Sequence, residues 1–463
     1  MYPSHYYFNP IKVLPEILYP LISISSVRVF YPLTGDFVGS IGGGTALIYS
    51  GVLTVNSILI YKLLTYFKLI TVANNNDKVL LFISTIVIVL SFFYFGKNGN
   101  YLLKEVNVTC IYHYTIPAFL NISVVLFLMN HKAQGKQILC LNNSYLNFIL
   151  IICLYLCIFS NLFISCVLLS YASFIILNCS VQEFRNKIST IDFLIRVLKG
   201  NYQYLLLIVV WGLSAYLESK GGRAASLGIK APFTFNRVEQ AFSYFFSTTI
   251  DAIGIKKTHI ILLLACTALA NLALIRKILT KKIQNQDKTF LYNQIMLCWM
   301  ISFIIFYQIL LSVKTDCWYQ QRSSVMLCWF IWILLEFFLC LFYINRFISH
   351  ISAFVSLILI ILSCNLLIQK PVFEETNMLP NTNILAVKKF SNDIVDRLKK
   401  AEQQEFTELK LQVPNFKRND NWPLGVYAGD AIANTLRKHG IIKRKLKVVI
   451  VPDNQMNKYY SLP

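Results

Sequence analysis

The chain has 463 residues, of which 56% are apolar and only 14% are charged. Soluble proteins carry about 25% charged residues, and several apolar runs here are long enough to cross roughly 30 Å of hydrocarbon, so an ordinary soluble enzyme is excluded. The formal net charge is +21, but the cations cluster in short loops between apolar runs, which is typical of membrane anchoring rather than of nucleic-acid binding. The predicted fold class is an all-α polytopic membrane protein in a lipid bilayer.

Residues 1–43 are aromatic, interrupted by proline and only moderately apolar, so we expect an outer-face segment with short amphipathic helices. Residues 44–368 form the predicted transmembrane bundle, with about ten crossings. The stretch 146–177 is too long for one helix, and we divide it near Ser160 into a helical hairpin. The predicted spans are 44–67, 79–95, 112–129, the two halves of 146–177, 202–217, 258–275, 290–313, 325–343 and 351–368.

Two short loops are rich in cations, and we expect both on the cytoplasmic side of the inner (plasma) membrane. They carry Arg185, Lys187, Arg196 and Lys199, and Arg276, Lys277, Lys281, Lys282 and Lys288. Alternation then places the long loop 218–257 outside, together with residues 1–43 and 369–463. Because an outer N-terminus without a preceding span is unusual, we expect that an upstream span is missing from this sequence.

Residues 369–463 return to ordinary soluble patterning. Their periodicity predicts helices at 383–405 and 427–439 and strands at 408–413 and 447–451, with the second helix ending at Gly440. We expect a small extracytoplasmic α/β cap.

The stretch WGLSAYLESKGGRA carries the first candidate site residues. On a helix, Trp211 and Glu218 share one face at the predicted membrane edge. The Gly-Gly step after this helix can expose backbone N–H groups, and Arg223 adds a guanidinium, so this corner suits a phosphate. The same residues also fit an ordinary glycine-terminated helix with an interfacial Arg and Glu.

The other candidates lie near the same predicted outer surface. Asp36 could act as a catalytic base alongside Glu218, or could cap a helix. His113 and Tyr114 could stack on a sugar or donate to a phosphate, whereas interfacial anchoring explains them equally well. Gln320 and Arg322 lie in an aromatic loop that suits carbohydrate and phosphate, with an aromatic belt and one snorkelling Arg as the alternative.

The sequence contains no pattern for a metal or an organic cofactor. The six histidines are far apart, most cysteines are single residues within apolar runs, and nucleotide, serine-hydrolase and zinc-protease motifs are absent. We therefore expect neither a metal nor a cofactor.

The order of these elements resembles the polytopic glycosyltransferases of the GT-C class, in particular the bacterial surface-polysaccharide glucosyltransferase group. The matching stretches are SGVLTVNSILIYKLL, CIYHYTIP, WGLSAYLESKGGRA, YQQRSSVMLCW and NWPLGVYAGDAIANTLRKHGII. The resemblance covers most of the chain and implies inverting transfer of a sugar from a polyprenyl-phosphate donor to a surface glycan such as O-antigen.

The chain departs from that group at its start. Such enzymes carry acidic residues in the first outer loop, whereas the corresponding SHYYFNP has none. We therefore expect an N-terminally truncated or degenerate copy. The alternative function is a non-catalytic transporter or assembly component for lipid-linked glycans, although we find no internal repeat of the kind that transporters show.

Overall fold

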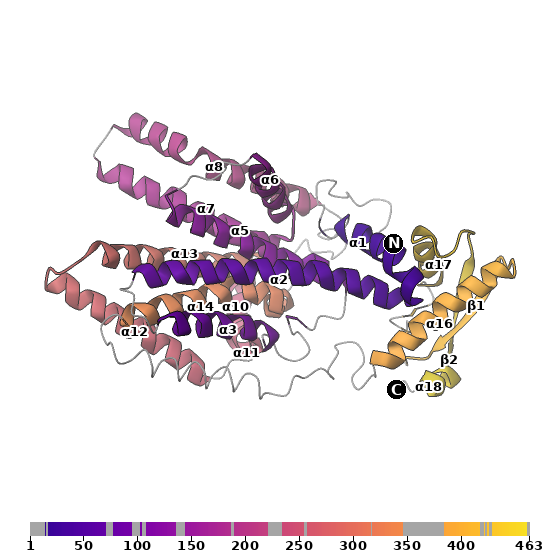
Figure 1. Ribbon diagram of the computed structural model, residues 1–463. Coiled ribbons are helices and arrows are strands. Elements are labelled where there is room, and N and C mark those ends of the chain that lie inside the picture. The colour runs from indigo at the N-terminus through magenta and orange to yellow at the C-terminus, as the bar shows by residue number, and fades with distance from the viewer. Residues whose placement is uncertain are drawn as a thin grey trace. The chain divides into compact units, whose positions relative to one another are not determined.

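The computed structural model describes residues 14, 17–70, 77–94, 102–103, 108–135, 144–186, 189–220, 234–253, 257–315, 317–345, 384–416, 421, 424–425 and 428–460. The chain forms two compact units (Figure 1). One unit, which we call the bundle, comprises Val52–Pro371 with Met1–Pro15, and the other, the terminal unit, comprises Glu16–Gly51 with Val372–Pro463.

The described part of the bundle is helical. Its elements are α2 (Phe37–Ile70, shared with the terminal unit), α3 (Asp77–Tyr94), α4 (Val108–Cys110), η1 (Ile111–Thr115), α5 (Ile116–Ala133), α6 (Ser144–Ile158), α7 (Leu162–Arg185), α8 (Thr190–Lys220), α10 (Phe235–Tyr244), η2 (Phe245–Thr249), α11 (Ile250–Ala252), α12 (Lys257–Leu279), α13 (Asn285–Lys314), η3 (Cys317–Gln321) and α14 (Ser323–Asn345). Here η1 and η2 are π-helical turns and η3 is a 3-10 turn.

Within the described residues, 6 helical stretches are long and apolar enough to cross a membrane. They are Phe37–Phe67, Val108–Ala133, Leu162–Arg185, Thr190–Ser219, Asn285–Lys314 and Ser323–Asn345. The apolar helices Lys78–Phe93 and Ser144–Ile158 are shorter, and the predicted span 351–368 lies outside the described residues. These helices confirm a mostly helical protein and are compatible with a multi-pass membrane protein, whereas the predicted number of crossings stays a prediction.

The predicted hairpin within 146–177 is confirmed. Helix α6 ends at Ile158 and α7 begins at Leu162. The side chain of Asn161 accepts a hydrogen bond from the backbone N–H of Phe163 at 2.9 Å, which caps α7 and fixes the position of the turn.

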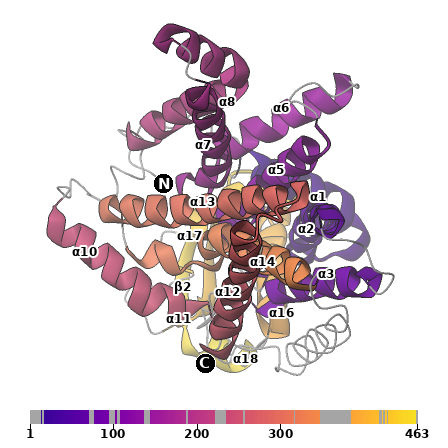
Figure 2. The same cartoon turned by 90° about the vertical axis from the view of Figure 1, so that its left-hand side faces the viewer.

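The helices differ in how deeply they are packed. In the most apolar window of α14, 89% of residues are buried inside the protein, compared with 11% for α8. Figure 2 shows α14 with α12 and α13 beside it, and both of these helices contact it. Helix α14 is therefore the centre of the bundle, and α8 presents most of its apolar surface outward, as a lipid-facing helix does.

Helices α7 and α13 run antiparallel. The indole N–H of Trp299 donates to Ser173 Oγ at 3.1 Å, and Gln308 Nε2 donates to the carbonyl oxygen of Phe163 at 2.8 Å. The α7–α8 and α12–α13 connections therefore lie at one end of the bundle, which we call the cationic end. The α6–α7 turn, the C-terminus of α8 and the start of α14 lie at the other, which we call the site end. The two cation-rich loops were predicted to share one side of the membrane, and they do lie at the same end.

A buried carboxylate organises the cationic end. The Asp287 side chain is fully buried and accepts hydrogen bonds from Lys277 Nζ at 2.6 Å and from the Tyr343 hydroxyl at 2.8 Å. Its second oxygen accepts from the backbone N–H of Gln284 at 2.8 Å, which completes a capping box at the start of α13. The Tyr343 ring also stacks on Phe290 at 3.8 Å. One side chain thus joins α12, α13 and α14.

The terminal unit combines both ends of the chain. It contains α1 (Leu18–Thr34), the start of α2, α16 (Ile384–Gln403), β1 (Glu408–Pro414), α17 (Ala428–Lys438), β2 (Lys447–Asp453) and α18 (Asn454–Tyr460). The strands are parallel, with Glu408 opposite Lys447, and α17 lies between them in the chain. Gly440 follows α17 with a φ of 75°, which favours glycine. The predicted C-terminal helices and strands are confirmed, and α18 was not predicted.

The predicted boundary at residues 43 and 44 falls within α2. Helix α2 continues from Phe37 through this position, and α1 is a single helix of 17 residues rather than a set of short ones. Val27 and Phe37 are buried in the same apolar core as Leu398 and Ile450, and Ser23 Oγ lies 2.7 Å from His439 Nε2. Helix α1 and the start of α2 therefore fold together with the C-terminal α/β elements.

Candidate functional site

Asp36, a candidate base, is engaged by structural contacts. One carboxylate oxygen accepts from the backbone N–H of Gly39 at 2.8 Å and from Asn392 Nδ2 at 3.0 Å, and the other pairs with Lys388 Nζ at 2.5 Å. Burial alone would raise the pKa of Asp36, but the hydrogen bonds from Lys388, Asn392 and Gly39 and the charge of Lys388 together hold it below its usual range. The geometry is that of a helix cap, the alternative that the sequence left open.

Replacement of Asp36 separates the capping role from a catalytic one. Asn also caps helices well, so we expect Asp36→Asn to change the free energy of unfolding by less than 1 kcal/mol, and Asp36→Ala to lower it by about 1 to 2 kcal/mol. Because the folded pKa is lowered, the wild-type contribution is present above the ordinary carboxyl pKa of about 3.9 and is lost as the pH falls through the folded value. Thermal unfolding measured between pH 7 and pH 3 checks both statements, and loss of glycosyl transfer in a stable Asp36→Asn protein would instead support a base.

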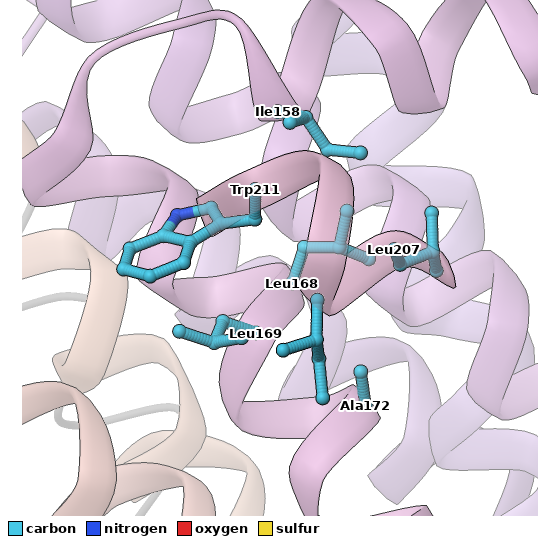
Figure 3. Close-up of a pocket in the computed structure, with 7 residues that line it drawn as sticks. Ile158, Leu168, Leu169, Ala172, Leu207 and Trp211 are labelled. Carbon is cyan, nitrogen blue, oxygen red and sulfur yellow. The ribbon is translucent and has the colours of Figure 1, made fainter. Parts of the chain in front are cut away.

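Trp211 packs three helices together. Its indole N–H donates to Ser165 Oγ of α7 at 2.9 Å, and its ring meets Tyr307 of α13 edge to face at 5.7 Å. The ring also lines a small pocket between α7 and α8 (Figure 3), whose other lining residues are all aliphatic: Ile158, Leu168, Leu169, Ala172, Leu207 and Ile208. The predicted polar face at Trp211 is therefore used for helix packing in the described structure.

The remainder of the WGLSAYLESKGGRA stretch is only partly described. Ser214 donates to the carbonyl oxygen of Ile158 at 3.2 Å, which ties α8 to the α6–α7 turn. Glu218 is half-buried in the last turns of α8, at the site end of the bundle. The predicted phosphate ligand Arg223 lies outside the described residues.

Arg322 is held between two aromatic rings. Its guanidinium carbon lies 4.2 Å from the ring centroid of Tyr114 and 4.6 Å from that of Trp318. Tyr114 belongs to η1, Trp318 to η3, and Arg322 immediately precedes α14, so segments far apart in the sequence build this site. We call Tyr114, Trp318 and Arg322 the Arg322 site. Cation–π contacts of this kind stabilise the position of a guanidinium without neutralising its charge.

The cation of the Arg322 site has no acidic partner in the described part of the chain. Arg322 forms no ion pair there, and its buried Nε makes no hydrogen bond to any described group. Buried charges are ordinarily paired, because an unpaired one is costly. A half-buried guanidinium between two rings is therefore suited to an anionic ligand.

Two π-helical turns flank this site. η1 carries Tyr114 and η2 contacts η3, the turn that carries Trp318. Phe245 of η2 also packs against Trp329 of α14 at 5.7 Å. π-helical turns are rare and are frequent at functional sites, since the extra residue changes where the side chains of a helix point.

Gln320, a candidate substrate-binding residue, is buried and fixes η3. Its side chain is 2% exposed. The Nε2 atom donates to Ser312 Oγ at 2.5 Å and to the carbonyl oxygen of Ala241 at 3.3 Å, and Thr249 Oγ1 donates to Oε1 at 3.5 Å. These contacts join the α10–η2 segment and α13 to η3. Gln320 therefore positions the turn that holds Trp318.

His113 lies beside the Arg322 site. Its ring is tilted against that of Tyr114, with 6.2 Å between centroids, and the side chain is half-buried. The structure thus brings Tyr114, Trp318 and Arg322 together, with His113 beside Tyr114. The aromatic loop that contains Trp318 and Arg322 was a candidate lining in the sequence, whereas the contact of Arg322 with Tyr114 was not predicted. In the described residues, no group of three or more His, Cys, Asp or Glu side chains could hold a metal ion.

Comparison with known protein families, with curated proteins and with solved structures gave no match.

Proposed function

We propose that the protein is a membrane glycosyltransferase that transfers a sugar from a polyprenyl-phosphate donor to a surface glycan on the outer side of the inner (plasma) membrane. The observation that carries this proposal is the Arg322 site: a guanidinium between the rings of Tyr114 and Trp318, with no acidic partner among the described residues. The class of ligand follows from the chemistry of these groups.

A guanidinium and aromatic rings recognise complementary parts of a lipid-linked sugar. The guanidinium can donate two parallel hydrogen bonds to a phosphate, and an aromatic ring face can stack on a pyranose. An apolar bundle supplies the surroundings in which a polyprenyl chain is soluble. One donor molecule therefore satisfies all three features.

Glu218 is the proposed catalytic carboxylate, since the described contacts of Asp36 are structural. In an inverting transfer the acceptor hydroxyl attacks the anomeric carbon and gives its proton to Glu218, while the bond to the donor phosphate breaks. The polyprenyl phosphate leaves with the electron pair of that bond. A guanidinium beside the phosphate would stabilise the charge that develops there.

Arg322 variants test the phosphate contact. Arg322→Lys keeps the charge but loses the planar fork, so we expect it to weaken binding of a polyprenyl phosphate nearly as much as Arg322→Ala, by about 5- to 150-fold. Binding is measured with the full chain in nanodiscs that contain defined amounts of the lipid. The matched control is Arg196→Ala at the cationic end, whose side chain is exposed and pairs with Glu183 at 3.7 Å. Unchanged binding of the polyprenyl phosphate by Arg322→Lys would indicate that Arg322 only anchors the protein in the membrane.

The alternative function is a non-catalytic transporter or assembly component for the same lipid-linked glycans. The contacts of Asp36 with Lys388, Asn392 and Gly39 favour it, because they occupy one of the two candidate catalytic carboxylates. Transfer of labelled sugar from a polyprenyl phosphate by purified protein separates the two functions. Binding without transfer, in a wild-type protein supplied with acceptor glycan, would support the alternative.

A further inference from the structure

Helix α8 is longer than one membrane crossing requires. It has 31 residues, or roughly 46 Å at 1.5 Å per residue, whereas the hydrocarbon core of a bilayer is about 30 Å thick. The helix is kinked at Asn201, where the backbone φ of −127° and ψ of 16° are not helical. Residues 202–220 after the kink are long enough to cross the membrane. Residues 190–200, which we call the pre-kink segment, therefore extend beyond the crossing at the cationic end.

The pre-kink segment has three distinct faces. Val197 is buried and Phe193, one turn earlier, is half-buried, so these two side chains mark the face that packs on the protein. A second face consists of four apolar residues at i, i+3, i+4 and i+7, each between 43% and 71% exposed: Ile191, Leu194, Ile195 and Leu198. We call these four residues the apolar stripe. The third face is charged and exposed, and it carries Asp192, Arg196 and Lys199.

The apolar stripe does not take part in packing the bundle. At 100° per residue, it lies roughly 130° around the helix from Phe193 and Val197. Four large aliphatic side chains exposed on one face mark an interaction surface rather than ordinary solvent contact. Because the segment continues directly into the crossing of α8, that surface is held close to the boundary between lipid headgroups and acyl chains.

Lys199 places a cation beside the apolar stripe. Its side chain is exposed, and the ion pairs of the described chain do not include it, whereas Arg196 pairs with Glu183 at 3.7 Å. On the helix Lys199 is four residues after Ile195, so its alkyl stem can cover the edge of the stripe while the ammonium reaches outward. The charge at this position is complementary to lipid phosphates.

We propose that the pre-kink segment lies in the membrane interface, with its apolar stripe among the outermost parts of the acyl chains and Lys199 against the phosphates of anionic lipids. Helices with an apolar face and a basic polar face bind membranes in this way, through buried apolar area and attraction to anionic headgroups. The kink at Asn201 allows the segment to leave the direction of the crossing. The proposal requires that α8 crosses a membrane, but it does not depend on sugar transfer.

Fluorescence quenching tests the position of the segment in the full chain reconstituted in liposomes. A fluorescent non-canonical amino acid is placed at Leu194 in the stripe, at Asp192 on the charged face, or at Val209 after the kink, where the side chain is 68% exposed. We expect lipids brominated near the glycerol end to quench the label at Leu194 most, and lipids brominated deeper in the chain to quench the label at Val209 most. Aqueous iodide should quench the label at Asp192.

Two outcomes of this experiment would overturn the interfacial position. Iodide quenching at Leu194 as strong as at Asp192 would place the segment in water. Protection of Leu194 from both quenchers would show that protein covers the stripe, which would make it a surface for a partner or a second copy of the chain. Val209 tests the premise separately, because a label there that brominated lipid does not quench would mean that α8 is not a lipid-facing crossing.

The same label tests the contact with anionic headgroups. With the label at Leu194, we compare quenching by brominated phosphatidylglycerol and by brominated phosphatidylcholine in membranes of constant composition, which gives the local preference for the anionic lipid. Lys199→Gln should lower that preference about fivefold. The matched control is Lys288→Gln, which removes an exposed cation of α13 at the same end of the bundle and should leave the preference unchanged. An unchanged preference in Lys199→Gln, or an equal loss in both variants, would overturn the headgroup contact.

Discussion

Replacing Asp287 with Ala is expected to lower the free energy of unfolding of the bundle by about 3 kcal/mol, because it removes the buried carboxylate that pairs with the Lys277 ammonium. Lys277 keeps 16% of its side chain exposed, which places the loss at the lower end of values for broken buried ion pairs. The substitution also removes the cap at the start of α13 and the acceptor of the Tyr343 hydroxyl. Equilibrium unfolding with SDS in mixed micelles measures the change.

The control variants distinguish the loss of the ion pair from the loss of the helix cap. Asp192 is the third residue of α8, the position that Asp287 has in α13, and its exposed carboxylate accepts from the hydroxyl of the capping residue Ser189 at 2.7 Å, so Asp192→Ala should cost no more than about 1 kcal/mol. Asp287→Asn keeps a capping side chain and should be intermediate. Adding Lys277→Met to Asp287→Asn should restore part of the loss, since the partly buried ammonium is then removed together with the carboxylate. Equal effects of Asp287→Ala and Asp192→Ala would show that the ion pair contributes little.

Replacing Gln320 with Ala is expected to lower the free energy of unfolding by about 2 to 4 kcal/mol, through lost hydrogen bonds and a buried cavity. Gln321, the next residue of η3, is only half-buried, so Gln321→Ala should stay within about 0.5 kcal/mol of wild type. The same SDS unfolding measures both variants. Because η3 carries Trp318, the Gln320 variant should also change the tryptophan fluorescence of the folded protein.

This pair of variants also decides between two roles for Gln320. A sugar ligand would lose binding at unchanged stability, whereas a positioning residue loses stability together with the geometry of the Arg322 site. Binding of a polyprenyl phosphate by Gln320→Ala, measured at a temperature where the variant is folded, separates these outcomes. Wild-type stability with weakened binding would support the substrate-binding role that the sequence predicted.

The local features of this protein were determined by its sequence. Apolar length predicted the spans, the α6–α7 hairpin followed from a run too long for one helix, and the periodicity of residues 383–451 predicted two helices and two strands. The cation-rich loops were predicted to share a side, and they lie at one end of the bundle. Each of these properties depends on residues close together in the chain, so a single sequence contains the information.

The partners of the polar side chains were decided only by the tertiary structure. α7 and α13 are both strongly apolar, yet 61% of the window of one and 39% of the other are buried. A membrane helix that is apolar on every side has no stripe to show which face meets its neighbours. Two properties decide which side chains meet: the rotation of each helix about its own axis and the identity of the neighbouring helices. They determine the contact of Tyr114 with Arg322, the pairing of Asp36 with Lys388 and the burial of Gln320. The local sequence pattern determines neither the rotation of a helix nor its neighbours, because both result from packing between segments distant in the chain.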